Sequence, residues 1–317
     1  MPAELEGPAD RALRTLFAAS WGKARGWIEG GKVKVNGHLV TEPTARVRAG
    51  AEIALDESAR RPRPKELEDG DVVHVDAHVV VVAKPPGIST IPYEGSEETD
   101  TLDARVRAWL ERQQSRSPRS SSRSSARSGG GDRGRGRPPL GIVHRLDKET
   151  SGLVVFTRSW LAKQALTSQF RQHTVHRRYL TIANGVVQAG TRRSFLLADR
   201  GDGLRGSARG NVRGSTEARE AITHVTPLEA LPGATLVACR LETGRTHQIR
   251  IHLSESGHPV LGERVYIRDF AGPLLLAPRL MLHAAELGFV HPATERPMQW
   301  ELPMPADMRE VIARLKG

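Results

Sequence analysis

Cysteine is almost absent from this 317-residue chain, which contains only Cys239. A single thiol can form neither an internal disulfide nor a cysteine-based zinc site, so both are excluded. The chain also lacks an apolar run near the roughly 18 residues that a membrane-spanning helix needs. Its first ten residues, MPAELEGPAD, lack the basic and apolar regions of a secretory signal. We therefore expect a soluble, cytoplasmic protein, and its 38% hydrophobic content is enough for a folded core.

Basic residues are in excess, with 47 Lys plus Arg against 36 Asp plus Glu and a net charge of +11. Residues 114–138 contain 7 Arg and one Asp, so this short segment carries +6 of the total. Its Ser/Arg/Gly-rich composition has too few apolar residues to offset the entropy of ordering, and we expect a disordered insertion. Such tracts attract RNA phosphates, but a solvated linker has the same composition, and both interpretations remain open.

The N-terminal part has the pattern of a small module of two helices and a hairpin. Apolar residues at helical spacing predict helices over residues 11–19 and 23–29. The segment KVKVNGHLV follows, and its alternation around an Asn-Gly pair predicts a tight β-hairpin. The run IEGGKVKVNG at residues 28–37 gives residues 11–55 a resemblance to the RNA-binding domain first described in ribosomal small-subunit protein four.

This resemblance implies that the second helix and the adjoining turn lie on structured RNA. The basic residues suited to phosphate contacts there are Lys23, Arg25, Lys32 and Lys34. A basic face that only contacts solvent is the alternative.

A domain boundary is predicted near residues 60–64, RRPRP, because two prolines deny both helical and ladder hydrogen bonds. The predicted domains are residues 1–63, including the linker, and residues 64–317, interrupted by the insertion. In the second domain, short Val/Ile/Leu runs separated by glycine alternate with helical segments. We therefore expect an α+β domain with a central sheet.

One carboxylate stands among cations in the segment GIVHRLDKETSGLVVFT, residues 141–157. The second half of the segment predicts a buried strand, which places the charged residues at the strand entrance. A lone Asp147 between Arg145 and Lys148 is most often a salt-bridged structural residue. The neighbouring positive charge would also keep it ionised, as a nucleophile or base requires, so the residues alone leave both roles open.

A second constellation lies in LETGRTHQIRIHL, residues 241–253. We expect a strand over residues 237–243, a turn at Gly244, and a helix whose N-terminus and two arginines bind an anionic group. His247 and His252 invite a metal interpretation, but a spacing of five places them on different faces of a helix with about 3.6 residues per turn. No carboxylate stands at a ligand spacing, so we expect no metal.

The two segments together resemble the RluA-type RNA pseudouridine synthases, which isomerise uridine in ribosomal and transfer RNA. The strongest matches are HRLDKETSGLVVFTRS and LETGRTHQIRIHL. Supporting matches are VVVVAKPPGIS, HRRYLTIANG, GHPVLGERVY and LMLHAAELGFVHP. Glu263 departs from the family, which more often has Asp there. The resemblance implies a mixed, mainly antiparallel central sheet with flanking helices and loops.

Carried over residue by residue, the resemblance makes Asp147 the essential aspartate and Arg245 its cationic partner. It makes Tyr179 the aromatic residue that stacks on the target base and relays a proton, and Arg145 the residue that fills the place vacated by the flipped nucleotide. The residues that would support the loop or the pocket are His144, Leu146, Ile249 and Leu253.

The reaction that the resemblance implies needs no cofactor and no metal. Its most favoured substrate is large-subunit ribosomal RNA, because the N-terminal module is typical of that group, and the chain is expected to act as a monomer. Transfer RNA as substrate and a non-catalytic RNA-binding or ribosome-assembly factor are the alternatives.

Overall fold

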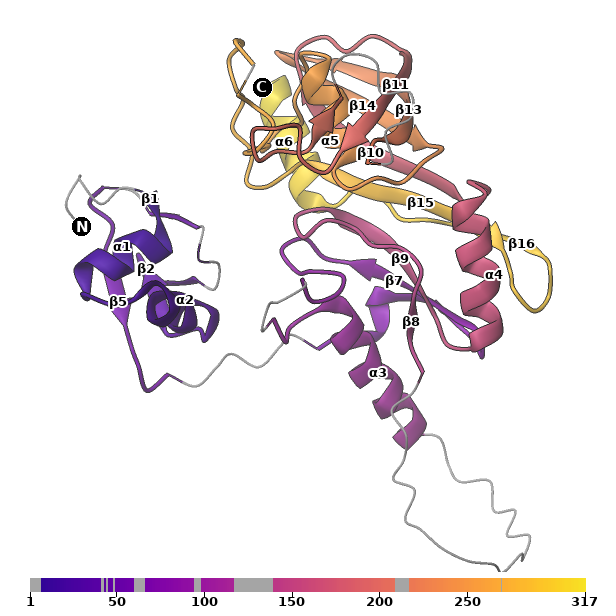
Figure 1. Ribbon diagram of the computed structural model, residues 1–317, viewed down its shortest axis with the longest axis horizontal. Coiled ribbons are helices and arrows are strands. Elements are labelled where there is room, and N and C mark those ends of the chain that lie inside the picture. The colour runs from indigo at the N-terminus through magenta and orange to yellow at the C-terminus, as the bar shows by residue number, and fades with distance from the viewer. Residues whose placement is uncertain are drawn as a thin grey trace, which may run out of the picture. The chain divides into compact units, whose positions relative to one another are not determined.

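The chain forms two compact units, Met1–Lys65 and Glu66–Gly317. Figure 1 shows the computed structural model, in which the division falls two residues beyond the predicted boundary. The residues that the structure describes are 7–40, 43, 45–47, 49–59, 66–93, 98–116, 139–208, 217–268 and 270–317. No helix within these ranges is long and apolar enough to cross a membrane.

The N-terminal unit contains two helices and short strands. Its elements are β1 (Gly7–Pro8), α1 (Ala9–Leu16), α2 (Trp21–Glu29), β2 (Val33–Val35), β3 (His38–Val40), β4 (Arg46–Val47) and β5 (Ile53–Leu55). Helix α2 begins after Ser20, whose hydroxyl accepts the backbone N–H of Lys23. The β2–β3 turn has positive φ at both Asn36 and Gly37, as a type I′ hairpin requires. The predicted helices and hairpin are therefore present, with α1 beginning and ending earlier than expected.

The second unit is built on one mixed sheet with the strand order β12-β11-β13-β14-β10-β15-β9-β7-β6 in the described residues. Strand β16 pairs with β15, and β8 pairs with β9. Its strands are β6 (Val72–Val75), β7 (Val79–Lys84), β8 (Gly141–Ile142), β9 (Ser151–Thr157), β10 (His176–Asn184), β11 (Gly190–Leu197), β12 (Gly206–Ser207), β13 (Arg219–Leu231), β14 (Ala234–Leu241), β15 (Leu282–Val290) and β16 (Pro297–Glu301). The helical elements are η2 (Asp69–Asp71), α3 (Leu102–Arg116), α4 (Trp160–Arg171), α5 (Gln248–Glu255) and α6 (Ala306–Lys316). The predicted α+β class and mainly antiparallel sheet are confirmed.

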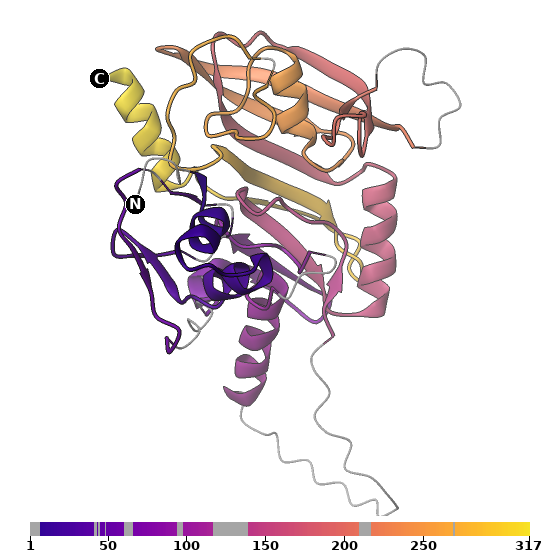
Figure 2. The same cartoon turned by 60° about the vertical axis from the view of Figure 1, so that its left-hand side comes forward.

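Helices cover both faces of the sheet around β7 and β9. Val79 and Val81 of β7 pack in one apolar cluster with Leu166 of α4. Val80 and Val82, on the opposite face, pack in the cluster that contains Val106 of α3. All four valines are fully buried, which explains the continuous apolar run in the sequence. Figure 2, a view from another direction, shows α4 lying along the strands.

Strand β9 connects the sheet to the loop that carries Asp147. It pairs antiparallel with β7 and parallel with β15, the one parallel pair of strands in the described part of the sheet. Gly152 has a φ of 120°, and a Cβ there would lie 2.3 Å from the backbone oxygen of Ala284. Only glycine allows so close an approach of β15, so the strand entrance is held tightly at this point.

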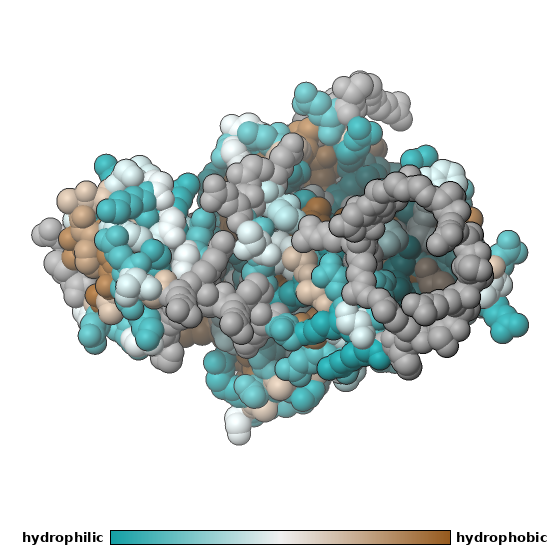
Figure 3. Space-filling view, turned by 90° about the horizontal axis from the view of Figure 1, so that it is seen from below, coloured by the Kyte–Doolittle hydropathy of each residue, from teal (hydrophilic) through white to brown (hydrophobic). Residues whose placement is uncertain are grey.

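The insertion predicted over residues 114–138 begins too early. Residues 114–116 belong to α3, whose last turn contains Arg116. Ser115 extends the helical pattern, and its hydroxyl donates to the backbone oxygen of Glu111. The expectation of disorder falls on residues 117–138, which lie outside the described residues. On the face seen in Figure 3, hydrophilic residues cover much of the described surface and hydrophobic ones form separate patches.

Candidate active site

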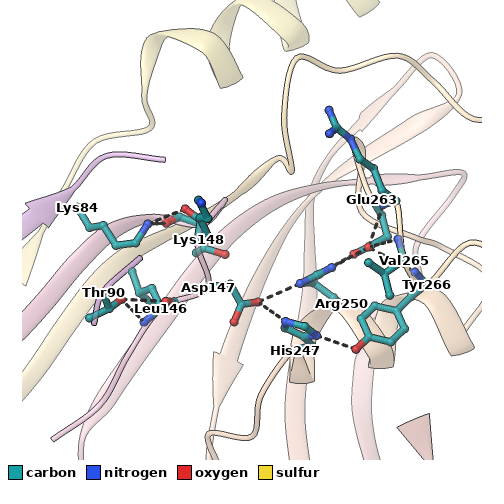
Figure 4. Close-up of polar contacts among 12 residues, drawn as sticks. Lys84, Thr90, Leu146, Asp147, Lys148, His247, Arg250, Glu263, Val265 and Tyr266 are labelled. Atoms are coloured by element: carbon teal, nitrogen blue, oxygen red, sulfur yellow. Dashed lines mark hydrogen bonds and ion pairs between the residues drawn. The ribbon is translucent and has the colours of Figure 1, made fainter. Parts of the chain in front are cut away.

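The loop that carries Asp147 is held from one side by Thr90. The Thr90 hydroxyl donates to the backbone oxygen of Leu146 at 2.8 Å and accepts its N–H at 3.0 Å. Thr90 is buried, and Leu146 packs in the main apolar cluster. The residue before Asp147 is therefore fixed in both its backbone and its side chain (Figure 4).

Lys84 holds the same loop from the other side, which the sequence analysis did not predict. Its ammonium group donates to the backbone oxygens of Lys148 at 2.8 Å, Thr150 at 2.7 Å and Pro85 at 3.0 Å. The side chain is almost completely buried, and this burial lowers the pKa of Lys84 to about 7, although Glu149 and Asp147 oppose the shift. Figure 4 shows this clamp directly beside Asp147.

The cationic partner of Asp147 is Arg250, and the expectation that Arg245 has this role is wrong. Nη1 of Arg250 lies 3.3 Å from Oδ2 of Asp147. Arg245 instead donates through Nε to the backbone oxygen of Glu220 at 2.9 Å. The physical reason is that α5 begins only at Gln248, so Arg245 precedes the helix and Arg250 lies in its first turn.

Glu263 binds the other edge of the Arg250 guanidinium in a two-point ion pair of 2.7 and 2.8 Å. Its side chain has no exposed surface and also accepts the backbone N–H groups of Arg264 and Val265. Burial opposes ionisation of Arg250, but its hydrogen bonds and charge pairing with Glu263 and Asp147 raise its pKa overall. Arg250 is thus permanently charged, and Glu263, whose two oxygens are both hydrogen-bonded, holds it toward Asp147.

His247 is a third group at the carboxylate. Its Nε2 lies 3.7 Å from Oδ2 of Asp147, and its Nδ1 lies 2.7 Å from the hydroxyl of Tyr266. His247 has a φ of 59° and a ψ of 18° at the N-terminal cap of α5. The expectation of a helix through this residue is therefore incorrect, because the chain turns sharply here before α5 begins.

Asp147, His247 and Arg250 line a pocket of about 400 Å³. Of the predicted residues, its walls include His144, Arg145, Leu146, Asp147, Tyr179, Arg245 and Ile249. Leu253 does not line it and is buried in the same apolar cluster as Ile249. Tyr179 lies on β10 with 8% exposed surface, and burial raises the pKa of its hydroxyl. The pocket thus combines one carboxylate, a neutral phenol and several arginines, with a volume that suits a nucleobase.

Comparison with known proteins decides the family. The sequence profile described as RNA pseudouridylate synthase matches residues 78–255, and the S4 domain profile matches residues 10–53. The chain belongs to the RNA pseudouridylate synthase family. It carries an S4 domain at its N-terminus, and both resemblances noted in the sequence are confirmed.

Relatives of this pseudouridine synthase match nearly its whole length. Ribosomal large subunit pseudouridine synthase D of Zymomonas mobilis is 32% identical over 96% of this chain and 93% of its own length. The protein of the same name from Pseudomonas aeruginosa is 31% identical over 100% and 94%. The solved structure of human RNA pseudouridylate synthase domain containing 4 has a TM-score of 0.58 at 22% identity, covering 78% of this chain and 93% of that one, and so supports the fold.

The pocket floor of the synthase contains a neutral histidine. Nε2 of His144 accepts the backbone N–H of Val155 at 3.0 Å, and its ring stacks on Phe170 with centroids 4.7 Å apart. Burial, together with the charge of Arg177, lowers the pKa of His144 to about 3. An accepting Nε2 carries no proton, so the hydrogen bond from Val155 requires the neutral form of the His144 ring.

A pH-dependent stability follows from His144. The unfolded chain takes up a proton below pH about 6.5, but the folded chain does not until pH about 3. Stability is therefore lost as the pH falls through this window, by about 2 kcal/mol between pH 6.5 and 5 at about 1.4 kcal/mol per unit. Denaturant unfolding of wild type and His144→Asn at both pH values should show a smaller loss in the variant. Equal losses in the two proteins would contradict the assignment, and His258→Asn, which removes a histidine elsewhere, is the control.

Two arginines of the pocket are candidates for substrate contacts. Arg145 is exposed at the rim and makes no hydrogen bond or ion pair within the described part of the chain. Arg177, which the sequence analysis missed, is buried and donates to the backbone oxygen of Glu242 at 2.7 Å. Its Nε has no partner among the described residues, although its position two residues before Tyr179 was a usable signal.

The predicted RNA contacts of the N-terminal module lie on α2 and β2. Arg25 pairs with buried Asp10 at 3.0 Å, and Lys32 donates to the backbone oxygen of Glu57 at 2.7 Å. Lys23 lies over the Trp27 ring at 4.8 Å, and Lys34 is exposed. As for metal, the described residues contain no cluster of three or more His, Cys, Asp or Glu that could hold an ion.

Proposed function

We propose that this pseudouridine synthase converts uridine to pseudouridine in large-subunit ribosomal RNA, with Asp147 as the reacting carboxylate. The observation that carries the proposal is the state of Asp147 in the pocket: Arg250 holds Oδ2, while Oδ1 has no partner among the described residues. A carboxylate with one oxygen anchored and one available suits attack or proton removal. The relatives named as large-subunit synthases and the S4 domain support the choice of RNA.

The reaction breaks the bond from ribose C1′ to uracil N1 and forms a bond from C1′ to C5. The C5 proton is lost to a base, and N1 gains a proton, so the reaction is an isomerisation without net change in atoms or electrons. Three roles of Asp147 are compatible with this balance: attack on C1′, removal of the 2′ proton to give a glycal, or addition to the uracil ring. In each role the carboxylate must be ionised, which Arg250 favours.

The substrate nucleotide must leave the RNA stack to reach Asp147. Extrusion costs a few kcal/mol, which contacts inside the pocket offset. We assign base stacking and proton relay to Tyr179, and we assign the vacated place in the RNA to exposed Arg145. Lys23, Arg25, Lys32 and Lys34 are assigned to phosphates of the same RNA.

Tritium release from RNA that contains uridine labelled at C5 tests this proposal. Large-subunit ribosomal RNA, small-subunit ribosomal RNA and transfer RNA are incubated separately with the full chain. We expect release from large-subunit RNA alone. Release from transfer RNA alone would identify transfer RNA, and not ribosomal RNA, as the substrate. If the folded protein releases no tritium from any RNA, the proposed function is contradicted.

A further inference from the structure

His247 lies beside the Asp147 carboxylate and is bound by Tyr266, and neither residue has a role in the reaction as described so far. Both residues are brought to Asp147 from distant parts of the chain, His247 from the cap of α5 and Tyr266 from the loop after Glu263. Figure 4 shows the Tyr266 hydroxyl, the His247 ring and the Asp147 carboxylate in one line. The distances along this line are 2.7 and 3.7 Å.

The backbone of His247 adopts a conformation that is unfavourable for a residue with a side chain. A φ of 59° is in the left-handed region, where a residue with a side chain costs about 1–3 kcal/mol relative to its usual conformation. His247 makes no side-chain capping bond to α5 that would compensate for this cost. In this conformation the ring lies between Asp147 and Tyr266.

The surroundings of His247 keep its ring neutral. Burial lowers its pKa, and Arg250 and Arg205 lower it further, while Asp147 and Glu263 act in the opposite direction. Burial also raises the pKa of Tyr266 to about 12, so its hydroxyl keeps its proton. An ionised carboxylate only accepts, so the single proton of the neutral ring lies on Nε2, which faces Oδ2 of Asp147. Nδ1 is then an acceptor, and the Tyr266 hydroxyl donates to it and holds this tautomer.

We propose that His247, with its tautomer set by Tyr266, is a positioning residue that directs the Nε2 proton to Oδ2 of Asp147. Arg250 and His247 then both act on Oδ2, and Oδ1 is left as the oxygen that meets the substrate. The 3.7 Å separation is longer than a hydrogen bond and closes when the substrate nucleotide enters, as bonds of this kind do in reactive complexes. The inference rests on the proposed role of Asp147.

Two substitutions separate this role from a structural one. Tyr266→Phe keeps the ring and removes only the hydroxyl that sets the tautomer. His247→Asn keeps a residue that tolerates the left-handed conformation, but its shorter amide does not reach Asp147. We expect each to lower the single-turnover rate of tritium release by about tenfold to a hundredfold, as small displacements of a reacting group do, with RNA affinity unchanged.

A rescue and a double variant make the test specific. His247→Gln, one methylene longer than Asn, restores an N–H donor at Oδ2 and should recover most of the rate. The double variant should be no slower than His247→Asn alone, since the hydroxyl acts only through the ring.

Tyr93→Phe, which removes a hydroxyl from an exposed tyrosine, is the matched control and should react at the wild-type rate. The inference is overturned if Tyr266→Phe and His247→Asn react like wild type, if they lose RNA affinity in proportion to rate, or if Gln rescues no better than Asn. Asp147→Asn in the same assay tests the proposed function separately. Activity in that variant would remove the role of Asp147 whatever the His247 variants do.

Discussion

Asp147→Asn is expected to reduce tritium release to background, at least about a thousandfold below wild type, because the reaction needs a negatively charged carboxylate. The amide has the same shape, and Arg250 keeps its two-point pair with Glu263. The fold should therefore be retained, and removal of one negative charge from the pocket should not weaken RNA binding. Single-turnover assays and RNA binding measurements on the same preparation check both parts.

The matched control is Asp100→Asn, which removes a carboxylate that pairs with Arg105 outside the pocket. It should release tritium at the wild-type rate. Wild-type release by Asp147→Asn would show that another group performs the chemistry. Loss of RNA binding in that variant would show instead that Asp147 organises the pocket.

Arg250→Met should have the second large effect, on both stability and rate. It leaves the fully buried carboxylate of Glu263 without its cation, and removing one partner of a buried pair costs about 3–5 kcal/mol. It also removes the charge that holds Oδ2 of Asp147. Chemical denaturation and single-turnover tritium release measure the two effects separately.

Arg250→Met/Glu263→Gln separates these effects. The Gln oxygen still accepts the backbone N–H groups of Arg264 and Val265, but no charge is left buried. Most of the lost stability should return, while the rate stays low because Asp147 has no cation. Arg245→Met, by contrast, loses one bond to a backbone oxygen, worth about 1 kcal/mol, and should affect RNA affinity more than the chemical rate. A larger rate loss in Arg245→Met than in Arg250→Met would restore Arg245 as the partner.

The contrast between Arg245 and Arg250 shows where sequence reasoning stopped. Both arginines lie in one short motif, and a continuous helix from Gly244 would have presented them on different faces. The left-handed residue at His247 delays the helix, so Arg250 occupies the first turn. The φ of one residue therefore decides which arginine meets Asp147. The identity of a residue does not by itself give its φ, although histidine tolerates positive values better than most residues.

Lys84 and Glu263 illustrate a second limit. Each is a charged residue whose sequence neighbours suggest a turn, and each is almost completely buried. Lys84 binds loop carbonyls 64 and 66 residues away, and Glu263 binds Arg250 across 13 residues. The polar partners of a buried charge come from the packing of separate segments, which local patterns do not encode.

The sequence by itself determined the two-part organisation, the fold class and the family, because each depends on short-range signals: helix periodicity, the Asn-Gly hairpin, the valine run of β7 and contiguous motifs. The same motifs singled out Asp147 as the candidate reacting residue. Tertiary structure decided which groups meet at that aspartate. Asp147 and Arg250 are separated by 103 residues, and their contact exists only because β9 and the α5 segment pack around one pocket. The reactive geometry is therefore a product of long-range packing and of strained backbone at His247, and both are properties of the folded chain.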